Sequence, residues 1–125
     1  MPKKVKDGKI QLSHAQLKRQ IVDYLRWYKW LVIPINQGPF AYDGIADLYI
    51  IKYFSHGNKY FSHGNYQIWL EIKVGKDKQS KAQSKFEIDI INQGGRYWLV
   101  KSLEDLESYL RDYGLLQTKP IRERE

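Results

Sequence analysis

The chain has 125 residues, a mass of 14.9 kDa, no cysteine and a formal net charge of +7. This length suits one domain with a single core, and a hydrophobic fraction of 42% with 14% aromatic residues argues against a disordered chain. The absence of cysteine excludes disulfides, thiolate metal sites and cysteine nucleophiles. No apolar run approaches the roughly 20 residues that span a bilayer, and no secretory signal pattern begins the chain. We therefore expect a cytoplasmic protein with no membrane partner.

Positive charge is concentrated in two regions of the chain. Residues 1–30 carry a net charge of +6 and residues 71–101 carry +3, whereas residues 31–70 are neutral and residues 102–125 carry −2. Two basic regions suit a polyanionic partner, most often nucleic acid. Simple solubility is the alternative explanation for the same charge.

The first predicted element is an amphipathic helix over residues 14–30. Ser13 and Gln16 have the spacing of a capping box at its start. Trp27 and Trp30, near its end, would either stack on bases or belong to the core. Apolar residues at spacings of three and four form the predicted inward stripe, which consists of Leu17, Ile21, Tyr24 and Tyr28.

Three strands are predicted next. A short strand over residues 31–36 contains Pro34, which places it at a sheet edge or at a bulge, and residues 37–44 read as a loop. Residues 45–54 form a strand that is apolar on both faces, which is typical of a central strand. Residues 66–74 form its antiparallel partner.

A seven-residue stretch is duplicated between the two long strands, as YFSHGNK at 53–59 and YFSHGNY at 60–66. The triplet HGN favours a turn, so the two copies predict an extended hairpin over residues 53–66. Its aromatic residues suggest that the hairpin packs against a partner chain or DNA. In one interpretation His56 and His63 bind a metal or DNA; in the other, the duplication is neutral because lengthening a loop costs little.

The second half of the chain alternates helix and strand. A helix over residues 79–93 ends at a pair of glycines, a strand covers residues 96–100, and a final helix over residues 102–110 begins with a capping box. The order α-β-β-β-α-β-α predicts a single α/β domain with a mixed central sheet flanked by helices. The expected divisions are a basic N-terminal arm (1–12), the folded domain (13–113) and a C-terminal tail (114–125).

Two acidic residues are brought together by the expected hairpin. Paired residues of an antiparallel hairpin have numbers of constant sum, and a turn centred on Lys59 sets Asp47 opposite or near Glu71. Adjacent carboxylates repel unless a proton or a cation lies between them, and oxygen ligands favour Mg²⁺ or Mn²⁺. Lys73 shares a strand face with Glu71, where it would stabilise an attacking hydroxide or developing phosphate charge. In the alternative interpretation Asp47 caps a turn, and Glu71 and Lys73 pair on a solvated face.

The stretches DGIADL, WLEIKVG and SKAQSKF, followed by GGRYWLVKSLEDLESYL, resemble the VRR-NUC family of the PD-(D/E)XK nuclease superfamily. The resemblance implies a restriction-endonuclease-like fold and a metal-dependent endodeoxyribonuclease. It implies that Mg²⁺ or Mn²⁺ is bound by Asp47, Glu71 and the main-chain carbonyl of Ile72. It also implies that Lys73 is the catalytic cation and that Gln83 helps to organise the catalytic site, whereas Gln83 would otherwise be a surface residue.

Stand-alone members of this family are similar to Holliday junction resolvases and are common in bacteriophages. The resemblance therefore implies a bacterial or phage-encoded homodimer that cuts branched DNA such as four-way junctions. The chain departs from the family in the first helix, where family members often place a glutamate and His14 or Gln16 stands near that position. The alternative function is a non-catalytic nucleic-acid-binding module that keeps the nuclease fold.

Lys78, Lys81 and Lys85 lie at helical spacings and predict a basic stripe on the second helix. In a nuclease this stripe would contact the phosphate backbone of DNA. In the alternative interpretation it is a solvated face whose charge is partly offset by Glu87 and Asp89.

Overall fold

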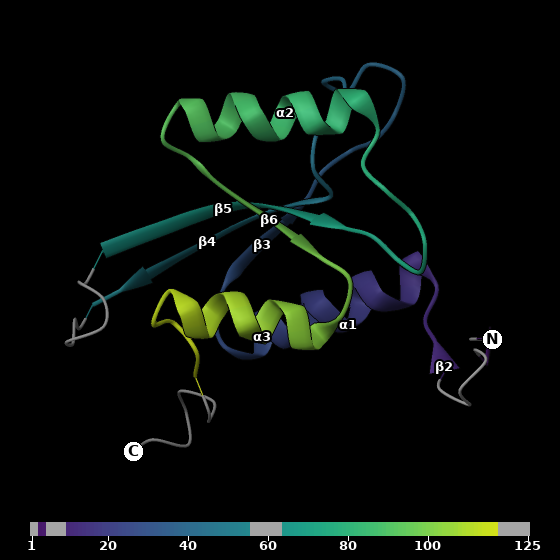
Figure 1. Cartoon of the computed structure of the whole chain (residues 1–125). Coiled ribbons are helices and arrows are strands. Elements are labelled where there is room, and N and C mark those ends of the chain that lie inside the picture. The colour runs from purple at the N-terminus through teal and green to yellow at the C-terminus, as the bar shows by residue number, and fades with distance from the viewer. Residues whose placement is uncertain (1–2, 5–9, 56–63, 118–125) are drawn as a thin grey trace.

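The computed structural model describes residues 3–4, 10–55 and 64–117. They form one small α/β domain with a four-stranded mixed sheet, a separate two-stranded sheet and three helices (Figure 1). Within these ranges no helix is long and apolar enough to cross a membrane. In chain order the elements are β1 (Lys3–Lys4), β2 (Ile10–Gln11), α1 (His14–Trp27), β3 (Leu31–Pro34), β4 (Leu48–Phe54), β5 (Gly64–Ile72), α2 (Lys81–Asn92), β6 (Arg96–Val100) and α3 (Leu103–Asp112).

The main sheet has the strand order β3-β4-β5-β6. Strand β4 is antiparallel to both β3 and β5, whereas β6 runs parallel to β5 after the crossover through α2. The apolar strand β4 is interior, and β3, which ends at Pro34, lies at an edge; both positions confirm the sequence-based predictions. The short β1–β2 pair was not predicted.

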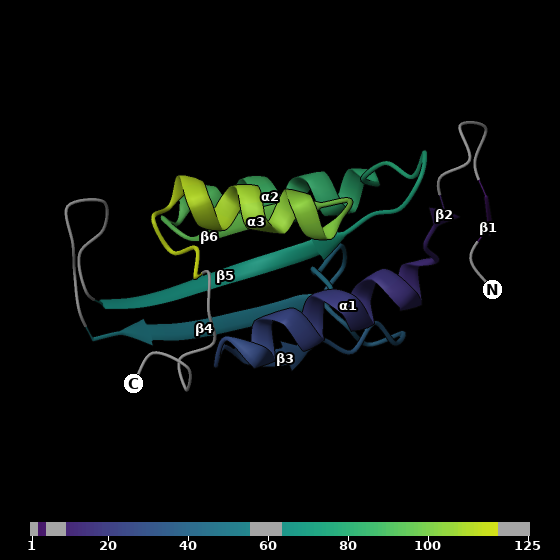
Figure 2. The same cartoon turned by 90° about the horizontal axis from the view of Figure 1, so that it is seen from below.

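The sheet separates two helical layers. Helix α2 covers one face, while α1 and α3 lie side by side against the other (Figures 1 and 2). Most of the apolar core lies between the sheet and the α1–α3 layer, where it includes Ile50, Leu70 and Trp98, all fully buried. A smaller cluster formed by Ala46, Phe86 and Tyr97 packs under α2. Asp47, Glu71 and Lys73 lie on this face of the sheet, under α2.

Helix α1 begins as predicted, and its inward face is close to the predicted one. Ser13 is the N-cap, and Ser13 and Gln16 form the reciprocal hydrogen bonds of a capping box. The buried residues are Leu17, Ile21 and Leu25. The prediction is confirmed for Leu17 and Ile21, whereas Leu25 takes a fully buried position that was not predicted. Tyr24 and Tyr28 are only partly buried at the margin of the core, a place that suits an amphipathic tyrosine.

Several predicted boundaries are corrected by the structure. Helix α1 ends at Trp27 rather than at residue 30, and Lys29 follows with a positive φ of 71°. The side chain of Trp30 is buried in the core, whereas Trp27 is exposed. At the other end, buried Leu115 extends the core past the boundary predicted at residue 113.

The predicted hairpin register is confirmed. Leu48 pairs with Leu70 and Ile50 pairs with Ile68, so the paired numbers have the sum that a turn centred on residue 59 requires. Residues 56–63 lie outside the described ranges, and with them His56 and His63. The interpretations of the duplicated segment therefore stay predictions.

Candidate functional site

Asp47 and Glu71 lie together under helix α2. Asp47 directly precedes β4, Glu71 is the penultimate residue of β5, and the confirmed register brings these positions opposite each other. Their exposed fractions are only 7% and 2%. Among the residues that the structure describes, these two are the buried charged ones. A buried charge is costly unless it is paired, so each carboxylate needs a partner.

The loop before β4 is pressed against the first turn of α2. Gly44 has a positive φ of 78°, and a Cβ atom built there would lie 2.2 Å from the carbonyl oxygen of Ala82. Only glycine tolerates both conditions. The side-chain amide of Gln37 also donates to the carbonyls of Ile45 and Ala46. These contacts fix the segment that delivers Asp47 to the site.

The Asp47 carboxylate is oriented by the main chain of β5 rather than by a turn. Its Oδ2 atom accepts a hydrogen bond of 2.8 Å from the main-chain N–H of Ile72. A carboxylate held in this way keeps one oxygen fixed at the end of β5. The alternative role of Asp47 as a turn cap is not what the hydrogen bonds show.

Glu71, Lys73 and Gln83 form a connected polar group. Lys73 Nζ donates to Gln83 Oε1 at 2.8 Å and lies 3.4 Å from Glu71 Oε2, which also accepts from Gln83 Nε2 at 3.2 Å. The Lys73 side chain is only 14% exposed, so this ion pair does not lie on a solvated face. The alternative of a surface position for Gln83 is also wrong, because Gln83 is partly buried and contacts both charged residues.

Gln83 has a second role in the local structure of α2. Ser80 is the N-cap of this helix, and its main-chain N–H donates to Gln83 Oε1 at 2.9 Å. Ser80 and Gln83 thus form a capping box. The spacing Ser-x-x-Gln was visible in the sequence and would have placed the helix start correctly at Lys81.

Burial and like charge act on the Glu71 carboxyl group in the same direction. Removal from water, together with the negative charge of Asp47, raises the pKa of Glu71 to about 7 against the opposing effect of Lys73. The other carboxyl oxygen, Oε1, is buried without a hydrogen-bond partner. A buried carboxylate with an unpartnered oxygen is costly unless a proton or a cation satisfies it.

The donor set suits a hard divalent cation. Among the described residues no three His, Cys, Asp or Glu side chains form a ready-made metal-binding group. Two adjacent carboxylates, one with an unpartnered buried oxygen, nevertheless fit Mg²⁺ or Mn²⁺, which often bind one or two carboxylates and keep several waters. Asp47, Glu71 and the carbonyl of Ile72 are the groups that would hold the ion.

His14 contacts the carboxylate of Asp47. It is the first residue of α1, the helix on the face of the sheet opposite α2. Its Nε2 atom lies 3.4 Å from Asp47 Oδ2, and 44% of its side chain is exposed. The sequence left open whether His14 or Gln16 occupies this position. In the structure Gln16 is used in the capping box of α1 and His14 approaches Asp47.

Only two of the three lysines of the predicted basic stripe lie on a helix. Lys81 and Lys85 lie on α2, but Lys78 belongs to the loop that precedes the helix. All three are exposed, and Lys85 donates to Asp89 at 2.7 Å. Glu87 instead accepts from Gln79.

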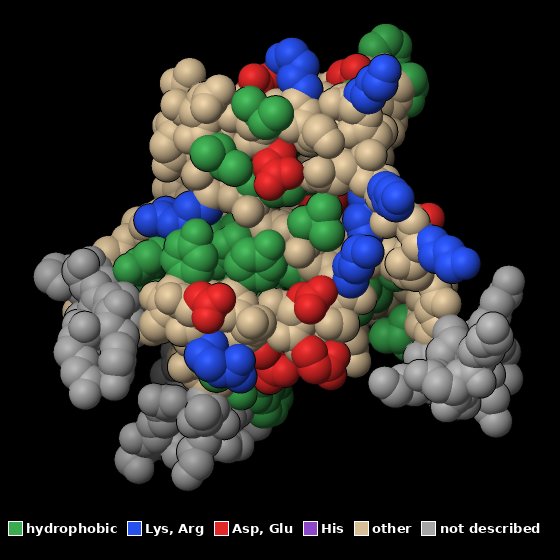
Figure 3. Space-filling view, viewed as in Figure 1, with side chains coloured by type: hydrophobic (Ala, Val, Ile, Leu, Met, Phe, Trp, Pro, Cys, Tyr) green, Lys and Arg blue, Asp and Glu red, His purple; other side chains and the backbone are tan. Residues whose placement is uncertain are grey.

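Two further lysines, Lys76 and Lys101, are exposed where the chain leaves β5 and β6. Lys and Arg side chains gather at this end of the domain, on the right of the space-filling view (Figure 3). No helical spacing links these two residues, and their common position depends on the parallel pairing of β5 and β6.

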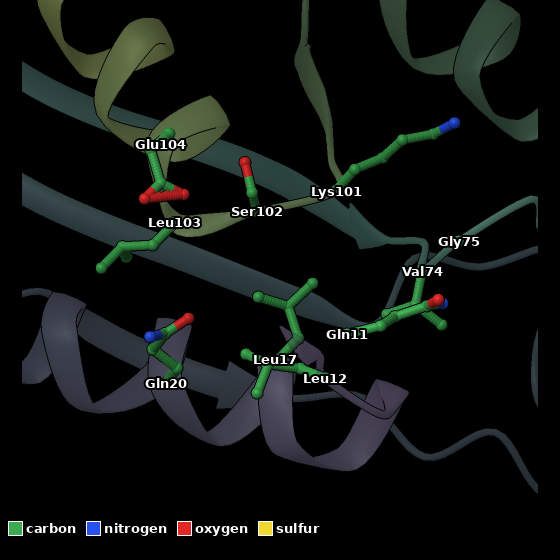
Figure 4. A pocket seen from close by; sticks show the side chains of 10 residues that line it. All are labelled: Gln11, Leu12, Leu17, Gln20, Val74, Gly75, Lys101, Ser102, Leu103 and Glu104. Carbon is green, nitrogen blue, oxygen red and sulfur yellow. The ribbon is translucent and has the colours of Figure 1, made fainter. Parts of the chain in front are cut away.

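A separate cavity of about 600 Å³ lies between α1, the end of β5 and the start of α3 (Figure 4). Leu12, Leu17, Val74 and Leu103 contribute apolar side chains to it. Neither carboxylate of the site lines this cavity, because both lie on the opposite face of the sheet.

Comparison with protein-family models, with curated proteins and with solved structures finds no match for this chain.

Proposed function

We propose that the chain is a divalent-metal-dependent endodeoxyribonuclease with a restriction-endonuclease-like fold. The observation that carries this proposal is the pair of buried neighbouring carboxylates, Asp47 and Glu71, beside a lysine that a glutamine holds in place. Glu71 Oε1 has no hydrogen-bond partner in the structure, so it needs either a proton shared with Asp47 or a bound cation.

Each residue of the site has a defined task in phosphodiester hydrolysis. A bound Mg²⁺ or Mn²⁺ supplies charge neutralisation at the phosphate and lowers the pKa of water. Asp47, Glu71 and the carbonyl of Ile72 would hold the ion, and the N–H of Ile72 keeps Asp47 in one orientation. Lys73 places a positive charge where the phosphate gains negative charge. Gln83 fixes the position of the Lys73 ammonium group.

We further propose branched DNA as the substrate and a homodimer as the active form. The resemblance to junction-cutting nucleases suggests both, since a four-way junction calls for two symmetric cuts. Exposed apolar side chains on the edge strand β3, Leu31 and Ile33, offer surface for such a pairing. Light scattering at several protein concentrations measures the oligomeric state.

The exposed lysines near α2 lead to a prediction about DNA affinity. Replacing Lys78, Lys81 and Lys85 by alanine is expected to weaken DNA binding and to reduce the salt slope of log K by about 2, because each phosphate contact contributes about 0.9 and the Asp89 partner of Lys85 lowers its share. Binding titrations between 50 and 200 mM salt measure both quantities.

The matched control for this variant removes the same charge from the opposite helical layer. Arg19 lies on α1, Lys29 follows the end of α1, and Arg111 lies on α3; all three are exposed. Their triple alanine variant should keep most of the salt slope. Equal losses in the two variants would mean that net charge, and not the surface near α2, determines DNA binding.

The decisive experiment is a cleavage assay on four-way, flap and duplex DNA with Mg²⁺, Mn²⁺ or EDTA. Cleavage that requires the metal and prefers the branched substrates is the expected result. Binding of all three DNAs with no cleavage by any metal would instead support the alternative, a nucleic-acid-binding module without catalytic activity.

A further inference from the structure

His14 is held in a defined place relative to the carboxylates. The capping box of Ser13 and Gln16 fixes the first turn of α1, and buried Leu17 anchors that turn to the sheet. His14 precedes Leu17 by three residues, so it lies on the same side of the helix, the side that faces the sheet. The imidazole therefore reaches the site from an element that the core immobilises.

His14 contacts Asp47, which is the more exposed of the two carboxylates. Lys73 and Gln83 approach Glu71 from β5 and α2, whereas His14 Nε2 approaches Oδ2 of Asp47 at 3.4 Å. Nearly half of the His14 side chain is exposed, so the imidazole borders solvent. His14, Asp47 and Glu71 do not form a ready-made metal-binding group in the described structure, so joint binding of an ion would require the imidazole to change its orientation.

We propose that His14 is a ligand of the metal ion held by Asp47 and Glu71, through its Nε2 atom. This inference rests on the metal site of the proposed function and adds to it a nitrogen donor from α1. A site with two carboxylates and one imidazole favours Mn²⁺ and later transition metals over Mg²⁺, which prefers oxygen ligands. The consequence is a changed metal preference.

Pulsed EPR of bound Mn²⁺ tests the assignment directly, because an imidazole ligand adds a ¹⁴N modulation to the signal. The chain contains three histidines, so the control is available within the protein. We expect the ¹⁴N modulation in the wild type, its loss in His14→Ala, and its retention in a variant with His56→Ala and His63→Ala.

A titration with Mn²⁺ and Mg²⁺ accompanies the spectra. His14→Ala is expected to lower Mn²⁺ affinity by about tenfold or more and to change Mg²⁺ affinity much less. Mn²⁺ that binds in an Asp47-dependent way without a ¹⁴N modulation would overturn the role of His14 and leave the carboxylate site intact. Absence of any bound Mn²⁺ would overturn both the role of His14 and the metal site itself.

Discussion

Lys73→Ala is expected to lower the rate of DNA cleavage by about 10³-fold or more, which is the cost of removing a group that stabilises charge in the transition state. DNA affinity should change by less than about tenfold, because one of many positive charges is lost. The prediction depends on the position of the ammonium group, which Gln83 Oε1 holds at 2.8 Å beside a buried carboxylate. Single-turnover cleavage and binding titrations separate the two effects.

The matched control is Lys76→Ala, which removes the same charge three residues further along the chain, at an exposed position. That variant should cut DNA within a few-fold of the wild type. Lys73→Met provides a second test, because it keeps the aliphatic stem and its packing while losing the charge. If Lys73→Met and Lys76→Ala cleave DNA equally well, Lys73 has no catalytic role.

The second large effect is a dependence of stability on pH that a metal ion removes. The pKa of Glu71 is raised to about 7 from an ordinary value of 4.5, so the folded protein holds a proton that the unfolded chain releases at lower pH. The stabilising effect of this proton is fully present below about pH 4.5 and is lost as the pH rises through about 7. The metal-free protein should therefore have a lower Tm at pH 8 than at pH 5.

Mn²⁺ should reverse this loss at pH 8 and have little effect at pH 5, because the ion replaces the proton between the carboxylates. At 100 times its Kd the ion stabilises the fold by about 2.7 kcal/mol, which corresponds to a rise in Tm of roughly 10 °C. Calorimetric melting in EDTA and in MnCl₂ at the two pH values measures the effect.

Three variants define the origin of this behaviour. Glu71→Gln should melt at nearly the same temperature at both pH values and should not respond to Mn²⁺, and Asp47→Ala should also lose the response to Mn²⁺. Glu104→Gln, at an exposed position on α3, should behave as the wild type does. A metal response that survives in both Asp47→Ala and Glu71→Gln would place the ion elsewhere.

Local sequence patterns predicted the features that depend on nearby residues. The Ser13 capping box located the start of α1, and the two apolar faces of residues 45–54 indicated the interior strand. The hairpin register followed from a turn centre, since antiparallel pairing fixes every pair once one pair is known. That register alone brings Asp47 and Glu71 together.

Contacts between elements that are distant in the sequence could not be predicted from local sequence patterns. The approach of His14 to Asp47 depends on where the start of α1 crosses the end of the sheet, which no periodicity encodes. The choice of Leu25 over Tyr24 for the core likewise depends on how α1 rotates against its neighbours. The exposure of Lys101 beside the loop after β5 follows from the parallel pairing with β6, which joins residues far apart in the sequence.

The two bonds accepted by Gln83 Oε1 have a consequence for the evolution of this domain. This one oxygen atom accepts from the main-chain N–H of Ser80, which caps the start of α2, and from the ammonium group of Lys73. Glutamate would serve a capping box equally well, but it would add a third negative charge beside Glu71. If Lys73 acts as proposed, selection for a stable helix and selection for a correctly placed lysine would favour the same residue, and the trade-off between stability and activity that is common at functional sites would be absent at this position.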